Sequence, residues 1–196
     1  MPSRTPTLSS ADQPAPVSCE RAAPAALDGG PVPDSMLFRE VMSHLASGVV
    51  LVTASIEGRP WGMTVSAACP ICIEPPTMLV SVGSRTALAK AVAETYRFGV
   101  NILGEGALAV ARFGSAVGQP KFLDEGLGLD PGTEHPATVM LDGALGHLDC
   151  EVVDVIAHGT HSIFLGRVLE MRVQDHRARR PLVHYRRSFW KVGRAA

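Results

Sequence analysis

The stretch from Trp61 to Val82, WGMTVSAACPICIEPPTMLVSV, decides the fold of this chain. Two β-rich runs, residues 61–68 and 77–82, flank the segment Glu74-Pro75-Pro76. Apolar and β-branched runs on either side of a proline-rich turn are typical of neighbouring strands. The stretch therefore predicts two strands joined through a turn, with no room between them for a helix.

Further β-rich runs lie on both sides of this stretch. Residues 49–53 precede Glu57-Gly58-Arg59-Pro60, which is typical of a hairpin turn. We expect more strands over residues 98–103, 144–157, 161–173 and 182–185. The apolar phase slips at Val153 and Val155, which predicts a bulge. Three short helices are expected, one after an N-cap at Asp34 and the others over residues 87–94 and 107–113. This pattern favours a mainly β fold, a closed or nearly closed antiparallel barrel.

The chain divides into a tail and one domain. Residues 1–33 hold seven of the fifteen prolines and no aromatic residue, so they cannot bury enough apolar surface to fold. We expect a disordered Pro/Ala-rich tail over 1–33 and a single domain over 34–196. Within that domain, residues 114–142 are rich in Gly and Pro and predict a long surface excursion of functional use.

Composition excludes several classes of protein. A formal net charge of −1 argues against a nucleic-acid binder, which needs an excess of Lys and Arg. No apolar run is typical of a signal peptide or a membrane span, so we expect a cytoplasmic protein. The irregularly spaced cysteines are expected to be free thiols in a reducing compartment: Cys19, Cys69, Cys72 and Cys150.

Most familiar site motifs are absent or incomplete. No G-x-G-x-x-G, P-loop, G-x-S-x-G or H-E-x-x-H pattern occurs. Cys69-x-x-Cys72 lacks the further ligands of a zinc site, so two half-buried side chains are the favoured interpretation. The pair His158-x-x-His161 flanks an expected turn, which favours a turn histidine and a pocket-facing histidine over a metal site. We expect no metal.

A candidate anion site lies at Ser84-Arg85-Thr86, between an expected strand and an expected helix. Unpaired N–H groups at a helix N-terminus, with a guanidinium and two hydroxyls, suit a phosphate. A plain helix cap with a solvated arginine explains the motif equally well, and Gly83 tilts the balance toward binding. A C-terminal basic cluster is interpreted as a solvated loop or a rim that attracts dinucleotide phosphates: Arg172, Arg177, Arg179, Arg180, Arg186 and Arg187.

The order of several motifs resembles one known family. Gly62-Met63-Thr64-Val65-Ser66-Ala67 and Glu74-Pro75-Pro76-Thr77-Met78-Leu79-Val80 are similar to a signature of the short-chain flavin reductases, the reductase components of two-component flavin-dependent monooxygenases and halogenases. The likeness continues through Phe98–Leu103, Lys121-Phe122, His161–Val168 and Pro181–Arg186, and so covers residues 38–192. Each motif is modestly specific, whereas the set in this order is strong.

The resemblance implies an antiparallel Greek-key split β-barrel, the FMN-binding split barrel, with a few short helices, in a homodimer. It implies an NAD(P)H:flavin oxidoreductase that moves hydride from nicotinamide C4 to flavin N5 and supplies reduced FAD or FMN to an oxygenase. NADH is expected, with NADPH as the alternative. No residue is strictly required for catalysis, and His161 is the candidate for positioning the nicotinamide. The expected cofactor-binding residues are Trp61, Gly62, Met63, Thr64, Val65, Ser66, Ser81, Val82, Gly83, Ser84, Arg85, Thr86, Lys121, Phe122, His161 and Tyr185.

Two other functions remain open at this stage. A non-catalytic electron carrier on the same barrel would retain flavin firmly and show no turnover. An enzyme similar to pyridoxamine-phosphate oxidase would oxidise a phosphorylated amine. The choice between FAD and FMN and the identity of the partner oxygenase are also left open by the residues.

Overall fold

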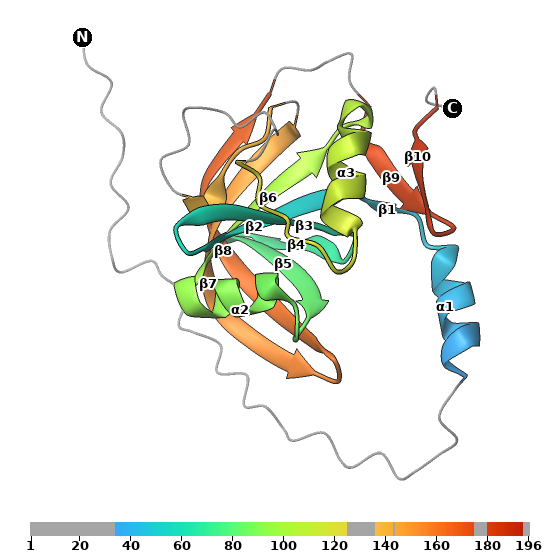
Figure 1. Cartoon of the computed structure of the whole chain (residues 1–196), viewed down its shortest axis with the longest axis horizontal. Helices are drawn as coiled ribbons and strands as arrows, with labels where there is room; N and C mark the ends of the chain where they lie inside the picture. Colours follow the sequence, from blue (N-terminus) through green and yellow to red (C-terminus); the bar gives the residue numbers. More distant parts are fainter. Residues whose placement is uncertain (1–33, 125–135, 143, 175–179, 194–196) are drawn as a thin grey trace.

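The computed structural model describes residues 34–124, 136–142, 144–174 and 180–193 (Figure 1). The helices are α1 (Ser35–Ser43), α2 (Ala87–Thr95), η1 (Glu105–Ala107), α3 (Leu108–Ser115) and η2 (Pro136–Thr138). The strands are β1 (Ser47–Gly48), β2 (Val50–Ile56), β3 (Arg59–Val65), β4 (Ala68–Ile73), β5 (Pro76–Gly83), β6 (Arg97–Leu103), β7 (Ala144–His158), β8 (His161–Val173), β9 (Leu182–Tyr185) and β10 (Ser188–Lys191). The expectation of a mainly β chain with short helices is confirmed, and the Asp34 carboxylate caps α1 by accepting from the Met36 N–H.

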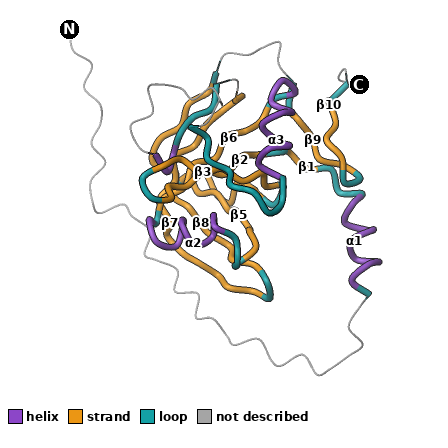
Figure 2. The backbone as a smooth tube through the Cα atoms, in the orientation of Figure 1, coloured by secondary structure: helices purple, strands orange, loops and turns teal. Residues whose placement is uncertain are grey.

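Seven strands form one antiparallel sheet in the order β3-β2-β6-β7-β8-β5-β4. The two edge strands, β3 and β4, follow each other in the chain with only Ser66 and Ala67 between them. Such a connection spans roughly 10 Å, so the sheet curls until its edges approach each other, while the ladder between them stays open (Figure 2). The prediction of one strand over 61–68 is therefore wrong at Ser66, where the chain crosses from one edge to the other.

The curled sheet encloses an apolar core. Side chains of β2, β3, β5, β6, β7 and β8 meet there with the buried face of α2, and Phe98 and Phe164 are its largest members. A second core on the other side of β2 and β6 includes Leu51, Leu103 and Leu123 and is covered by α3 and η2. α2 and α3 thus lie on opposite sides of β2. The start of α2 and the end of α3 both line one cleft.

Residues 137–141 are buried, which corrects the prediction of a surface excursion over the full length of 114–142. Thr53 donates its hydroxyl to the Ala137 carbonyl at 2.9 Å. The Asn101 side chain donates to the Val139 carbonyl and accepts from the Leu141 N–H, at 3.0 and 2.9 Å. These buried polar side chains replace the water that a loop backbone normally binds, so the segment packs inside. Residues 125–135 lie outside the described residues.

The long hairpin of β7 and β8 projects beyond the body of the sheet, below α2 in Figure 1. Its pairing register shifts between Asp149 and Cys150 and between Val152 and Asp154, which confirms the predicted bulge near Val153. β9 pairs with β1 and with β10, a strand that the sequence did not predict. These three strands form a small second sheet beside α1.

Cys69 and Cys72 are exposed, so the prediction of half-buried side chains is wrong. β4 is an edge strand with one neighbour in the sheet, and its residues from Cys69 to Ile73 are exposed. Cys69, Cys72 and Cys150 are free thiols, as expected, whereas Cys19 lies outside the described residues. Over the described ranges we find neither a metal-ligating group of three or more side chains nor a helix long and apolar enough to cross a membrane.

Acid should destabilise the fold through His147. This side chain is buried beneath η2, and burial lowers its pKa below the ordinary 6.5, an effect that the nearby Asp149 opposes. The folded state therefore binds a proton less readily than the unfolded chain, so its full stability is present above pH 6.5 and is lost below it. We expect the slope to approach about 1.4 kcal/mol per pH unit in denaturant titrations. His147→Gln should flatten that slope, and an unchanged slope would exclude His147 as its source.

Candidate functional site

A cleft of about 750 Å³ opens between the edge of β3 and the N-terminus of α2. Its third wall is the chain from the end of α3 to Phe122. The cleft is lined by Trp61, Met63, Thr64, Arg85, Thr86, Ala87, Leu88, residues 114–120, Lys121 and Phe122. Seven residues expected from the sequence to bind a cofactor thus come together in one concave surface.

The floor of the cleft is the free edge of β3. The Gly62 N–H donates to the Lys121 carbonyl at 3.0 Å, and the Leu123 N–H donates to the Pro60 carbonyl at 2.9 Å. These bonds pair the first half of the β3 edge with residues 121–123. Backbone groups alternate between the two edges of a strand, so the N–H and C=O of Thr64 point to the same edge as the Pro60 C=O and the Gly62 N–H. The pairing with residues 121–123 ends before Thr64. The Thr64 groups are available to a polar ligand edge.

The end of α3 packs closely on the same point of β3. Thr64 donates its hydroxyl to the Ala111 carbonyl at 2.8 Å, which fixes the helix against the strand. Gly114 follows one turn later, and a Cβ built there would lie 2.8 Å from the Thr64 nitrogen. Only glycine leaves space beside that N–H. Nothing in the helical pattern of residues 107–113 pointed to this role.

The other end of the cleft is the start of α2, where the sequence predicts an anion site. The Thr86 hydroxyl accepts from the Ala89 N–H at 3.2 Å and donates to the Gly83 carbonyl at 2.8 Å. The first N–H groups of a helix, here those of Ala87 and Leu88, have no partner within it. Arg85 is exposed beside them and makes no hydrogen bond or ion pair with any residue that the structure describes. The Thr86 hydroxyl therefore serves the helix cap, while Arg85 and the first N–H groups of α2 remain the predicted anion site.

Aromatic and cationic side chains close the third wall. Trp61 and Phe122 meet edge to face with centroids 4.9 Å apart, and the Arg59 guanidinium lies 3.9 Å from the Phe122 centroid. Arg59 also pairs with Asp124 through two hydrogen bonds of 2.9 Å, and this bonding lowers the pKa of the Asp124 carboxyl. Partial burial lowers the pKa of Lys121. Arg59, fixed by Asp124, thus supports the Phe122 ring. The wall presents an apolar surface and the Lys121 amine to the cleft.

Other predicted residues lie around this cleft rather than in it. Val65 and Val82 are core residues and Gly62 is buried, so they shape the site through the backbone. Ser81 and Gly83 are half-buried in β5, and Ser84 is tied to β8 by the Ser162 hydroxyl at 3.0 Å. Ser66 lines a small adjoining cavity. Tyr185 instead borders a separate hollow with Trp190, and its neighbour His184 lies beside Ser66.

His161 lies next to the anion site but faces away from the core. It pairs with Gly83 across β5 and β8, and its side chain is exposed with the Thr160 hydroxyl 3.0 Å from Nδ1. Ile163 and Leu165 share its side of the strand, whereas Phe164 carries the core face. His161 is therefore not a buried core residue.

The segments that form this cleft lie within a stretch of sequence that matches a known family. The model of the flavin reductase like domain matches residues 42–193, which is most of the chain. The chain belongs to this flavin reductase family.

Relatives of this flavin reductase chain span most of its length. The reductase component of a 4-nitrophenol 4-monooxygenase/4-nitrocatechol 2-monooxygenase from Rhodococcus opacus is 36% identical over 80% of this chain and 80% of that protein. A flavin reductase (NADH) from Kitasatospora aureofaciens is 33% identical over 81% and 83%. The Streptomyces globisporus NADH:FAD oxidoreductase SgcE6, in complex with NAD and FAD fragments, superposes with a TM-score of 0.73 at 26% identity, over 82% of this chain and 93% of that one.

Two residues that line the candidate site or the cavity beside it escaped the sequence prediction. Gly114 and His184 both lie beside the β3 edge, yet they come from segments 50 to 120 positions further along the chain. No local pattern connects them with Thr64 or Ser66. The resemblance pointed to Tyr185, one position from His184, and strand alternation puts the two side chains on opposite faces of β9.

Proposed function

We propose that this chain is an NADH-dependent flavin reductase that supplies reduced FAD or FMN to a partner oxygenase. The observation that carries the proposal is the cleft along β3, with an open backbone edge at one end and the α2 anion site at the other. The reduced nicotinamide gives hydride from C4 to N5 of the flavin, so both reacting atoms belong to bound molecules. The relatives named above support NADH as the donor and an oxygenase as the recipient.

In this proposal the protein works by positioning. Thr64 and its neighbours hydrogen-bond the polar edge of the flavin ring through the backbone, while Trp61 and Phe122 pack beside the ring. Arg85 and the first N–H groups of α2 hold the phosphate, with Lys121 adding a second cation. Fixing two reactants in contact can supply much of the catalytic effect without an acid or base.

One assay tests this function against the alternatives. Purified protein is freed of flavin, and NADH oxidation is followed with FAD or FMN added in turn. Steady turnover that saturates with flavin supports the reductase. Firm flavin retention without turnover would identify an electron carrier instead, and oxidation of a phosphorylated pyridoxamine would indicate the third alternative. A chain beginning at Pro33 should turn over equally, because we propose that residues 34–196 carry the whole activity and that 1–33 is a dispensable tail.

We further propose that the fold is the Greek-key split barrel and that the chain acts as a cytoplasmic homodimer. The two-residue link between β3 and β4 and the core shared by β3 and β5 support the barrel. The projecting β7–β8 hairpin and the β4 edge carry exposed apolar side chains, namely Val153, Val155 and Ile73, that suit a second copy. Light scattering at micromolar concentration would return the mass of one chain if the dimer proposal is wrong.

His161→Ala should damage hydride transfer selectively. Its side chain is exposed beside the 81–86 turn, so its removal leaves neither a void nor a buried unpaired group. We expect a raised KM for NADH or slower flavin reduction in stopped-flow experiments, with flavin affinity and the melting temperature almost unchanged. His158→Ala, on the facing strand of the same hairpin, is the matched control. Unaltered reduction kinetics in the His161 variant would remove this residue from the site.

A further inference from the structure

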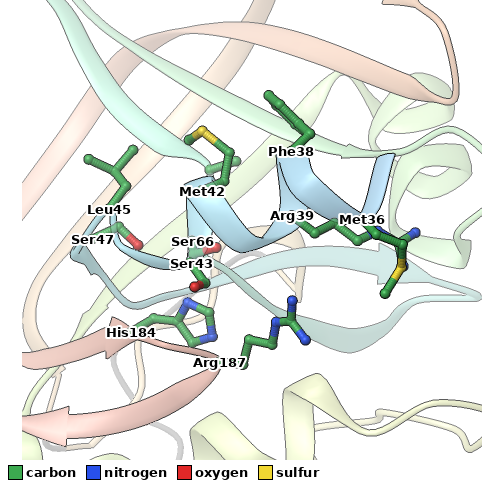
Figure 3. A pocket seen from close by; sticks show the side chains of 11 residues that line it. Met36, Phe38, Arg39, Met42, Ser43, Leu45, Ser47, Ser66, His184 and Arg187 are labelled. Carbon is green, nitrogen blue, oxygen red and sulfur yellow. The ribbon is translucent and has the colours of Figure 1, made fainter. Parts of the chain in front are cut away.

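A second hollow, of about 590 Å³, lies between α1 and the small sheet, outside the flavin cleft (Figure 3). Met36, Phe38, Met42 and Leu45 of α1 contribute apolar side chains to it. His184 of β9 and Arg187 of the β9–β10 turn lie across from the helix. α1 buries none of its residues, so these apolar side chains are left uncovered by the residues that the structure describes.

The hollow carries positive charge. Arg39 on α1 and Arg187 both line it, and His184 stands between them and Ser66. Arg39 makes no hydrogen bond or ion pair with any of the described residues. Arg187 has only a 3.4 Å contact with the exposed Glu40 carboxylate, which His44 shares at 3.7 Å. Apolar walls with two weakly partnered guanidinium groups suit a ligand that is both aromatic and anionic.

The hollow adjoins the flavin cleft through a small cavity that shares lining residues with both. A cavity of about 120 Å³ lies between them and shares Ser66 and His184 with the hollow. The same cavity shares Thr64 and Ser115 with the cleft. A long ligand with one end on the β3 edge can therefore extend past Ser66 to the two arginines. The cleft has its own anion site at the opposite end, so a second anionic group is required to use this one.

We propose that this hollow binds the adenosine diphosphate moiety of a dinucleotide, with its pyrophosphate on Arg39 and Arg187 and its adenine against Phe38 and Met42. This assignment rests on the proposed function, because NADH and FAD both carry that moiety and both would reach the β3 edge. NADH is the favoured source, since the flavin phosphate already has the α2 site. The nicotinamide ring of NADH then lies over the flavin cleft.

The experiment measures binding of ADP-ribose by calorimetry, which needs no turnover. Arg39→Gln should weaken binding roughly tenfold, as expected for the loss of one charge-assisted hydrogen bond. Glu40→Gln should tighten it by roughly two- to fivefold, because it frees Arg187 from an exposed ion pair. A gain in affinity cannot arise from misfolding. Arg112→Gln, an exposed helical arginine outside the hollow, is the matched control and should change nothing.

Kinetic measurements then show whether the adenosine diphosphate moiety in the hollow belongs to NADH or to FAD. With FMN as flavin, Arg39→Gln should raise the KM for NADH about tenfold and leave kcat unchanged, while an N-benzyl dihydronicotinamide without phosphate or adenosine is oxidised as before. A loss confined to FAD, relative to FMN, would assign the hollow to the flavin dinucleotide instead. Equal ADP-ribose affinity in all four proteins, or no binding at all, would overturn the proposal, even where NADH-dependent turnover proves the reductase itself correct.

Discussion

Replacing Gly114 with alanine should weaken flavin binding by roughly a hundredfold. The new methyl group would lie 2.4 Å from the Thr64 hydroxyl, 2.6 Å from Leu51 Cδ1 and 2.8 Å from the Thr64 nitrogen. Two of these atoms belong to the residue whose edge groups floor the cleft, and one of them is backbone. The helix must move away from β3 or the strand must shift, and either change displaces the groups that we assign to the flavin ring.

The expected size follows from the cost of overpacking. An extra methyl group in a filled site typically costs 1–3 kcal/mol, so we expect about that loss in the free energy of unfolding. If the strain is relieved only by disturbing the β3 edge, flavin affinity should fall by roughly a hundredfold. Flavin fluorescence quenching and a denaturant melt measure the two effects on one sample.

Gly106→Ala is the matched control for this variant. Gly106 lies in η1, ahead of the same helix, and an added Cβ there meets no atom within 4 Å. Its affinity and stability should stay near those of the parent chain. Normal flavin binding by the Gly114 variant would mean that the ring lies elsewhere in the cleft, away from Thr64.

Local pattern predicted the parts of the site that lie close together in sequence. The strand through Thr64 and the motif Ser84-Arg85-Thr86 each occupy a few residues, and each has a structure that short-range chemistry dictates. A strand alternates and a helix N-terminus leaves N–H groups unpaired, whatever the rest of the chain does. The start of α2 after Thr86 could therefore be expected from the residues alone, and the anion site at Arg85 stays a prediction.

Long-range hydrogen bonds determined what the pattern missed. Thr53 holds Ala137 across 84 positions and Asn101 holds Leu141 across 40, and these bonds draw residues 137–141, near the end of a Gly- and Pro-rich stretch, into the core. Composition cannot reveal a polar side chain that acts on a distant backbone. The exposure of Cys69 and Cys72 was missed for a similar reason. β4 is an edge strand only because of the order of all seven strands, which no local pattern reveals.

Replacing Arg85 should also have a large effect on flavin binding, because the structure gives Arg85 a different role from its neighbour Thr86. Arg85 is exposed at the mouth of the anion site and pairs with no described residue, whereas the Thr86 hydroxyl already makes two bonds within the α2 cap. Two adjacent residues of one motif therefore have different roles. Arg85→Ala should affect the ligand, and Thr86→Ala should affect the helix.

Arg85→Ala is expected to weaken flavin binding by about ten- to a hundredfold, the cost of roughly 1.5–3 kcal/mol for a lost charge-assisted hydrogen bond. Because the phosphate charge is the same before and during hydride transfer, kcat at saturating flavin should barely change. Thr86→Ala should instead lower the free energy of unfolding by about 1 kcal/mol through loss of the cap. Steady-state kinetics with varied flavin and a thermal melt distinguish the two variants. A normal flavin KM with a collapsed kcat in the Arg85 variant would move the phosphate away from α2 and place this arginine at the reacting rings.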